Sequence, residues 1–499
     1  MDYLIRFVHI HETFRQPETE ALAELAGLQI EWLSYSEDSP FALIRFRDAV
    51  DQTAAAKALV ARSILINAIY ELWGAGLDYD SLHSDIIART QPMWDQYNKS
   101  PFRFELDAFH GTRSPTEQRS IIETFSYMEF TGPIRMTQPH NQFRIFEDYL
   151  LNGKTAHHLY FGRLVATSGR KAMNKYDLKK RSYIATTSMD AELSLVTANL
   201  AQVAPGTLAY DPFMGTGSFP VACAHFGAAV FGSDLDGRSI RGKGDRNVKG
   251  NFVQYGTAAQ YLGGFVADLT NTPLREQRFL NSIVCDPPYG VREGLKVLGS
   301  TRVALQEVVY LSDGKPAHLQ PNYVPPKKPY SFMRMLDDVL DFAAERLIDD
   351  GRLCMWMPVA GAIEGEEPAE EKDAVPETEY TIPRHPALQL VSLCKQDFNK
   401  WSRRLLTYRR VRDGDVDQEQ LITYKAQRLS LAEIPIDVNL GADDLNAFRR
   451  KFFQGFKDPA VLAQREADGG SRRHDRSHDR RGPGAGHCPR EEVQQHGKT

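Results

Sequence analysis

Apolar residues in the C-terminal half recur as short runs that end in glycine-rich or acidic turns and alternate with stretches of helical spacing. The runs, in chain order, are TLAYDPFMGTGSF, AAVFGSDLD, GFVADLT, NSIVCDPPYG and, after the helical stretch YSFMRMLDDVLDFAAERL, GRLCMWMPV. Strands that alternate with helices form an open, mainly parallel sheet. The pattern therefore predicts an α/β domain from Gly206 onward.

The N-terminal half predicts two smaller α+β units. Short apolar runs (YLIRFVHI, LQIEWLSY, PFALIRF) surround a polar helical stretch near Glu18, and we assign this unit to residues 1–53. The next segment, AAAKALVARSILINAIYELWGAG, has the apolar spacing of a helix that ends at glycine, and FRFELDAFHG alternates like a strand. These elements predict a second unit over residues 54–170.

The third domain is expected over residues 171–463. A basic stretch, KYDLKKRSYIATTSMDAEL, passes into a helix whose start is signalled by Thr187 and Ser188, with Asp190 and Glu192 in its first turn. Residues 364–379 are acidic and poor in apolar side chains, which predicts a solvated inserted loop. Residues 464–499 are rich in Arg and nearly devoid of apolar residues, so we expect a disordered tail that is solvated or touches RNA.

Composition narrows the class of protein. A chain of 499 residues, 42% hydrophobic, is long enough for more than one core. The cysteines stand singly, without companion histidines at ligand spacing, which argues against disulfides and a bound metal. No stretch resembles a signal peptide or a membrane span, so we expect a cytoplasmic protein. The net charge of -5 argues against general coating of nucleic acid but leaves a local basic surface open.

The first candidate site is Asp211-Pro212-Phe213-Met214-Gly215-Thr216-Gly217-Ser218, between the first strand and its helix. Ligands bind at such strand ends in open α/β sheets, and glycine lets the backbone approach them closely. An acid at 211 suits an ammonium group better than a pyrophosphate. A glycine-rich turn that serves packing alone remains the alternative.

The next two strand ends also carry acids. Asp234, within Gly-Ser-Asp-Leu-Asp, is placed to bind ribose hydroxyls, although Asp234 or Asp236 would equally serve as a helix cap. Asp268 precedes the apolar Leu269 and is placed to contact an adenine amino group. Three neighbouring strand ends with an acid each favour one nucleoside ligand.

The sharpest motif is Asp286-Pro287-Pro288-Tyr289-Gly290 after the apolar strand SIVC. Prolines restrict the turn, so Asp286 and a proline carbonyl can both accept from one amino group, while Tyr289 offers a flat face for a base. An amino group conjugated into a base is a poor nucleophile that an enzyme must hold and aim. A rigid turn with a capping aspartate is the structural alternative.

Together, DPFMGTGS, SDLD, ADLT and DPPYG resemble the motifs of class I amino-group methyltransferases acting on nucleic acid bases. The stretch before the glycine loop, and FNKWSRRLLTYRRV near the end, resemble the eukaryotic and archaeal tRNA (guanine(10)-N2)-methyltransferase family. The resemblance implies a Rossmann-like domain with a mainly parallel seven-stranded sheet and S-adenosylmethionine as the methyl donor. It implies cofactor contacts from Asp211, Phe213, Gly215, Gly217, Asp234, Leu235, Asp268 and Leu269, and a target guanine held by Asp286, Pro287, Pro288 and Tyr289.

The same resemblance implies partners and an N-terminal organisation. The first unit would be ferredoxin-like and the second a THUMP domain that grips tRNA. Eukaryotic members of the family work with a small zinc-containing activator subunit. Basic residues flanking the catalytic region are candidates for phosphate contacts, or for an ordinary solvated face. They are Lys179, Lys180, Arg181, Lys327, Lys328, Arg403, Arg404, Arg409 and Arg410.

Two other functions stay open at this stage. DNA adenine and protein glutamine methyltransferases also hold an amino group with an Asp or Asn before Pro-Pro-Tyr. A catalytically silent RNA-binding scaffold with the same fold would show a damaged glycine loop or a damaged DPPY motif, and both motifs are intact. Residues 291–326, between DPPYG and the next helix, form a long loop that could close over the base, because a loop of this length is usually either functional or disordered.

Overall fold

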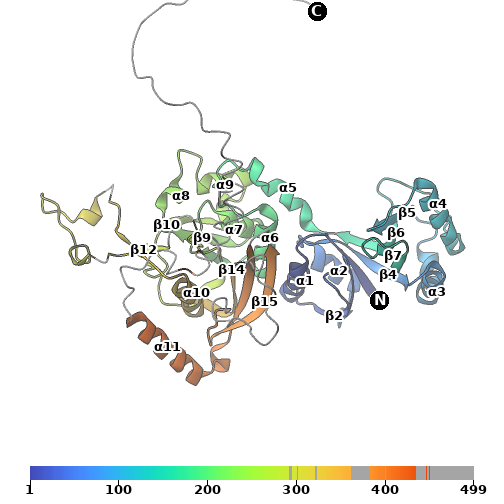
Figure 1. Cartoon of the computed structure of the whole chain (residues 1–499). Coiled ribbons are helices and arrows are strands. Elements are labelled where there is room, and N and C mark those ends of the chain that lie inside the picture. Colours follow the sequence, from blue (N-terminus) through green and yellow to red (C-terminus); the bar gives the residue numbers. More distant parts are fainter. Residues whose placement is uncertain are drawn as a thin grey trace, which may run out of the picture. The chain divides into compact units, whose positions relative to one another are not determined.

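The computed structural model describes residues 1–291, 295–300, 302–320, 323–360, 382–398 and 401–433, together with Asn446 and Arg449. The acidic insertion 364–379 and the Arg-rich tail 464–499 lie outside the described residues. Residues 1–452 form one compact unit. Within it, two seven-stranded sheets organise the chain, one in each half (Figure 1).

The N-terminal sheet has the strand order β2-β3-β1-β4-β7-β6-β5. Its strands are β1 (Asp2–Phe7), β2 (Gln29–Ser34), β3 (Phe41–Arg47), β4 (Ile66–Gly76), β5 (Phe102–Phe109), β6 (Asn141–Tyr149) and β7 (Ala156–Thr167). Its helices are α1 (Glu12–Leu25), α2 (Gln52–Val60), α3 (Tyr79–Thr90) and α4 (Pro115–Glu123). Among these strands, only β5 and β6 pair in parallel.

The helix expected over residues 54–76 is wrong for its second half. Only Gln52–Val60 is helical, and Ile66–Gly76 is strand β4, which pairs with β1 on one side and β7 on the other. Nearly every β4 side chain is buried, so its continuous apolar run carries no alternation that would distinguish a strand from a helix. The boundary expected at residue 53 falls in the first turn of α2, inside the β-α-β-β-α-β order that ends with β4.

The C-terminal sheet has the order β10-β9-β8-β11-β14-β16-β15. Its strands are β8 (Leu208–Asp211), β9 (Ala229–Asp234), β10 (Tyr261–Val266), β11 (Leu280–Cys285), β14 (Leu347–Ala360), β15 (Leu388–Asp397) and β16 (Trp401–Arg410). The five strands from β10 to β14 run parallel, and β16 pairs antiparallel with both β14 and β15. The expected Rossmann-like, mainly parallel sheet is confirmed.

Two apolar clusters cover the faces of this sheet. One includes α6 and α7 with Trp356, and the other includes α10 with Leu353 and Leu406. The helices are α5 (Ala172–Tyr176), α6 (Ala191–Leu200), α7 (Ser218–His225), α8 (Gly237–Arg241), α9 (Val248–Tyr255), α10 (Phe332–Arg346) and α11 (Gln418–Glu433). Among the described residues, no helix has the length and apolar character needed to cross a membrane.

Two further details refine the sequence prediction. Helix α6 begins after Asp190, whose carboxylate accepts from the Leu193 amide at 2.9 Å, so Asp190 rather than Thr187 or Ser188 is the cap. The segment between β11 and α10 carries a small hairpin of β12 (Lys296–Leu298) and β13 (Lys327–Pro329).

Candidate active site

Three acids stand at neighbouring strand ends of the C-terminal sheet. Asp211 ends β8, Asp234 ends β9 and Asp286 directly follows β11, and these strands pair in parallel. Their carboxyl ends therefore meet at one edge, as expected. Asp211 is buried and accepts the Phe213 amide at 2.9 Å. Burial, with the charges of the other two acids, raises the pKa of Asp211 well above its ordinary value.

The glycine loop takes backbone conformations that favour glycine. Gly215 has φ +49°, and Gly217 has φ +85° at the start of α7. A Cβ at Gly215 would meet no atom within 4 Å, so the loop leaves open space there. A Cβ at Gly217 would lie 3.1 Å from Val248. Gly215 thus borders a space that a ligand can enter, whereas Gly217 packs against α9.

Asp234 and Asp236 have different environments, which separates the two interpretations of this turn. Asp234 is partly buried and accepts the Gly215 amide at 2.9 Å and the Asp236 amide at 2.8 Å. Asp236 accepts the Arg238 amide as the cap of α8 and forms an ion pair with the Arg238 side chain. Burial raises the pKa of Asp234, while the Arg238 hydrogen bond lowers the pKa of Asp236. Asp236 is the helix cap, and Asp234 faces the glycine loop.

Asp268 is buried two residues beyond β10. Its oxygens accept the Thr270 amide at 3.0 Å and the Leu298 amide at 2.6 Å. Because Leu298 belongs to β12, Asp268 fastens the hairpin segment to the strand edge. Leu269 is buried in the core against α10, while Phe213 and Leu235 are partly buried. An adenine contact from Asp268 would use its remaining lone pairs.

A second stretch of the chain crosses the glycine loop. The Ser188 hydroxyl lies 2.8 Å from that of Thr216, and Arg181 donates to Ser218 Oγ at 3.1 Å. Asn251 Nδ2 donates to the carbonyls of Tyr183 and Thr216 at 2.9 and 3.2 Å. The KKRSYIATTS stretch is thus bound to the loop and to α9 by side-chain hydrogen bonds.

The DPPY turn places Asp286 and Tyr289 in direct contact. The Tyr289 hydroxyl donates to Asp286 Oδ1. Pro287 is buried and Pro288 is exposed. Burial is the largest effect on Asp286 and raises its pKa to about 6, although the Tyr289 hydrogen bond and the charge of Arg403 oppose it. One carboxylate oxygen is therefore engaged by Tyr289, and Oδ2 is left to accept from another donor.

Residues on and beside the last strand pair complete the wall next to this turn, and the sequence predicts no contact between them and DPPY. The Trp401 ring stands edge-on to Tyr289, with centroids 6.1 Å apart and planes at 72°. Phe398 stacks on Trp401 at 4.5 Å and 15°. Arg403 follows on β16, where its guanidinium lies 5.5 Å from the Phe398 ring centroid and its Nε donates to Gln396 Oε1 at 2.6 Å. Phe398 and Trp401 both lie in the FNKW stretch. Nothing in their spacing along the sequence indicates that β16 passes beside the DPPY turn that follows β11.

The chain after α11 also reaches the DPPYG turn. Asn446 Nδ2 donates to the Tyr289 carbonyl at 2.8 Å, and Arg449 Nη1 donates to the carbonyls of Gly290 and Val291 at 2.7 and 2.5 Å. These two residues satisfy backbone acceptors of the turn. No sequence signal marks them, because their role depends on contacts across about 157 residues of chain.

The basic residues proposed as a group for RNA are not equivalent. Arg181 and Arg410 are 5% and 3% exposed, and Arg410 donates to the Ala344 carbonyl at 3.0 Å. The expectation of phosphate contacts is wrong for these two, because their guanidinium groups are used inside the protein. Lys179, Lys180 and Lys327 are exposed and keep that role as a prediction.

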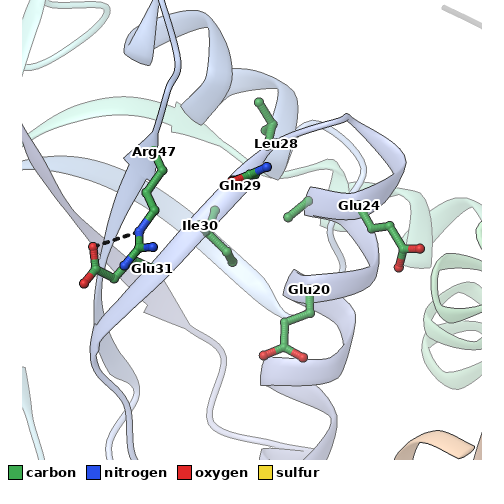
Figure 2. Close-up of a pocket in the computed structure, with 8 residues that line it drawn as sticks. Glu20, Glu24, Leu28, Gln29, Ile30, Glu31 and Arg47 are labelled. Carbon is green, nitrogen blue, oxygen red and sulfur yellow. Dashed lines mark hydrogen bonds and ion pairs between the residues drawn. The ribbon is translucent and has the colours of Figure 1, made fainter.

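A separate groove of about 540 Å³ lies in the N-terminal half, between α1 and β2 (Figure 2). Its acids already have partners: Glu20 accepts from Trp32, Glu24 pairs with Arg352, and Glu31 pairs with Arg47 at 3.3 Å. Nothing in this groove matches the chemistry of the strand-end acids. In the part of the chain that the structure describes, no three His, Cys, Asp or Glu side chains are grouped to hold a metal ion.

Comparison with known proteins matches both halves of the chain. Residues 1–170 match the family model described as Tmrp11 THUMP N-terminal domain, and residues 179–299 match RMKL-like, methyltransferase domain. The chain is 46% identical to a tRNA (guanine(10)-N(2))-methyltransferase of Saccharomyces cerevisiae, covering 81% of this chain and 92% of the relative. Proteins of that name from Schizosaccharomyces pombe and Homo sapiens are 36% and 31% identical, over 82% and 91% of this chain and 89% and 95% of theirs.

Proposed function

Since this chain belongs to the tRNA (guanine(10)-N(2))-methyltransferase family, we propose that Asp286 and its neighbours form the site where a guanosine of tRNA is methylated on N2. The observation that carries this assignment is the Asp286 carboxylate, engaged by Tyr289 through Oδ1 and left with Oδ2 as an acceptor. It lies at the same sheet edge as the glycine loop. Donor and acceptor of the methyl group would therefore meet along one edge.

The residues present fit S-adenosylmethionine as the methyl donor. Gly215 borders open space at the end of β8, and Asp234 at the next strand end keeps lone pairs beyond its two backbone hydrogen bonds. Asp234 would hold ribose hydroxyls, Asp211 would face the ammonium group, and Asp268 with Leu269 would border the adenine. Phe213, Gly217 and Leu235 would shape the same pocket.

Bound at this edge, S-adenosylmethionine supplies a methyl group made electrophilic by the neighbouring sulfonium. Guanine N2 is a poor nucleophile because its lone pair is conjugated with the ring. Asp286 Oδ2 and a proline carbonyl would each accept an N–H, which holds the amino group and aims its lone pair. As the C–N bond forms, the methyl–sulfur bond would break and leave a neutral thioether, S-adenosylhomocysteine. Nitrogen then gains positive charge and its proton becomes acidic, so Asp286 can accept it without being a strong base.

The N-terminal half would position the tRNA. We propose that the first unit is ferredoxin-like, that the THUMP-type unit binds tRNA, and that the exposed lysines near the catalytic domain contact phosphates. Extruding a base from a tRNA helix costs a few kcal/mol, so binding energy from a separate surface is needed. Filter binding of tRNA to the Lys179→Gln variant tests the lysines, with a weaker salt dependence as the expected result.

A small zinc-containing activator subunit and a cytoplasmic location complete the proposal. The activator subunit rests on the family resemblance. Co-expression with a candidate partner, followed by size-exclusion chromatography and zinc analysis of the complex, tests the first. A chain that elutes alone and is fully active would remove the partner from the proposal. Imaging of the tagged full chain tests the cytoplasmic location.

The deciding experiment is methyl transfer from labelled S-adenosylmethionine to unmodified tRNA, with nucleoside analysis of the product. N2-methylguanosine at position 10, lost in Asp286→Ala, is the expected result. Label in adenine or in protein would assign the site to another class of amino-group methyltransferase. Methylation that survives in Asp286→Ala would contradict the role of this carboxylate.

A further inference from the structure

Two residues from the chain beyond α11 bind three successive carbonyls at the end of the DPPYG turn. Asn446 is 3% exposed, and its Nδ2 donates to the Tyr289 carbonyl at 2.8 Å. Arg449 Nη1 donates to the carbonyls of Gly290 and Val291 at 2.7 and 2.5 Å. The backbone of the turn is therefore held by side chains that come much later in the sequence.

Asn446 is itself held in one orientation. Its Oδ1 accepts the Arg449 backbone amide at 3.0 Å, so Nδ2 is the atom that faces Tyr289. The approach to the turn is close, because Gly290 has φ +67° and a Cβ there would lie 3.0 Å from Asn446 Nδ2. The turn and the Asn446 side chain thus fit against each other without spare room.

The turn depends on such outside support because its prolines lack donors. Pro287 and Pro288 carry no backbone N–H, so neither can fasten the turn by donating a backbone hydrogen bond. Tyr289 joins the support to the site, since its carbonyl is bound by Asn446 and its hydroxyl donates to Asp286 Oδ1. A shift of the Tyr289 backbone would therefore carry the hydroxyl away from Asp286.

We infer that Asn446 and Arg449 are positioning residues for methyl transfer: they hold the end of the DPPYG turn so that Tyr289 stays on Oδ1 of Asp286 and Oδ2 stays directed at the target amino group. The inference rests on the role proposed for Asp286. Neither residue contacts substrate in this assignment, and both act through the backbone of residues 289–291. A displacement of about 1 Å at a reacting group can lower a rate about 100-fold.

Two other roles make different predictions. If the contacts serve stability alone, their loss would lower the free energy of unfolding and leave the rate of the folded enzyme unchanged. If Arg449 contacts a phosphate of tRNA, its loss would raise KM for tRNA at unchanged kcat. A positioning role lowers kcat at unchanged KM, because the geometry of the amino group matters only during transfer.

The test of Asn446 uses two variants of the full chain. Asn446→Asp keeps the shape and the acceptor of the Arg449 amide but presents an oxygen to the Tyr289 carbonyl. Asn446→Ala removes the donor without adding a charge. We expect both to lower the single-turnover rate about 10- to 100-fold, with KM for tRNA and affinity for S-adenosylmethionine unchanged within about twofold. Thermal unfolding shows whether each variant is folded at the assay temperature.

Arg449 is tested by a matched pair of variants. Arg449→Met keeps the length of the side chain without its donors and should lower the rate by a similar factor. Arg449→Lys keeps a cation that can donate to a carbonyl and should recover part of the rate. Arg412→Met is the control, because the Arg412 side chain is 67% exposed and pairs with Asp350 at 2.8 Å away from the turn. It should leave the rate unchanged.

A double mutant shows whether Asn446 acts through Tyr289. Adding Asn446→Ala to Tyr289→Phe should cost less than Asn446→Ala alone, because the hydroxyl that Asn446 positions is already gone. Unchanged rates, a raised KM for tRNA with normal kcat, additive losses, or no recovery in Arg449→Lys would each overturn the inference. Should the Asn446 variants fail to fold, the Arg449 pair decides by the same rates. Failure of the Asp286 assignment would appear separately, as methylation retained in Asp286→Ala.

Discussion

Asn199 Nδ2 donates a hydrogen bond of 2.7 Å to Glu18 Oε1, and the two residues are 181 positions apart. Glu18 lies on α1 beside the N-terminal sheet, and Asn199 lies on α6 beside the catalytic sheet. Glu18 also accepts from the Ser63 hydroxyl and from the Ile64 and Leu65 amides, at 2.8 to 2.9 Å. Both helices are thus joined by a buried polar network, and burial raises the pKa of Glu18.

Replacing Glu18 should destabilise the junction. Glu18→Ala removes the acceptor of four buried donors, so we expect the free energy of unfolding to fall by about 3 to 5 kcal/mol. Urea denaturation measures the change. Glu20→Ala on the same helix is the control, because Glu20 is exposed and its loss should change stability by less than about 0.5 kcal/mol. Equal losses in both variants would show that the network adds nothing.

Activity should depend on the ionisation of Asp286. Its pKa is raised to about 6, chiefly by burial, and only the carboxylate has a free oxygen to accept from the guanine amino group. We therefore expect kcat/KM to be level above pH 7 and to fall about tenfold per unit well below pH 6. A pH profile of kcat/KM checks this, with tRNA binding shown to be unchanged at each pH. An acid limb near pH 4 would mean that burial does not control this group.

The charged carboxylate of Asp286 should lower the free energy of unfolding at high pH. An Asp whose pKa rises from 3.8 unfolded to about 6 folded destabilises the fold by about 3 kcal/mol above pH 6. This cost shrinks as the pH falls toward 4, because the folded protein then binds the proton. Asp286→Asn should therefore be more stable than the wild type at pH 8, with a smaller difference at pH 5. A difference independent of pH would contradict this linkage.

Asp234 and Asp236 should differ in their effect on the cofactor. Asp234→Ala removes the acid that faces the glycine loop and the acceptor of the Gly215 amide, so affinity for S-adenosylmethionine should fall at least about tenfold, equivalent to about 1.4 kcal/mol. Asp236→Ala should leave affinity nearly unchanged and cost about 1 kcal/mol of stability as a lost helix cap. Calorimetric titration of both variants with S-adenosylmethionine measures the two affinities. An unchanged affinity in Asp234→Ala would contradict the ribose contact proposed for Asp234.

The sequence by itself determined the catalytic half of the fold and the acids at its strand ends. The alternation of strand, glycine turn and helix is local, and parallel strands must bring their carboxyl ends to one edge. The order of residues along the chain is therefore enough to place Asp211, Asp234 and Asp286 together.

Only the tertiary structure decided the rest. The sequence of strand β4 resembles that of a helix because both faces of the strand are buried. This burial depends on distant parts of the chain, since Ile69 packs in a cluster with residues of α1 and α2, and Tyr70 packs in another with Phe41 and Phe146. Arg403 has the sequence context of a surface cation, but β16 lies beside β14, and there its guanidinium lies over the rings of Trp356 and Phe398. Contacts between residues far apart along the chain leave no periodicity in the sequence, so packing alone assigns their roles.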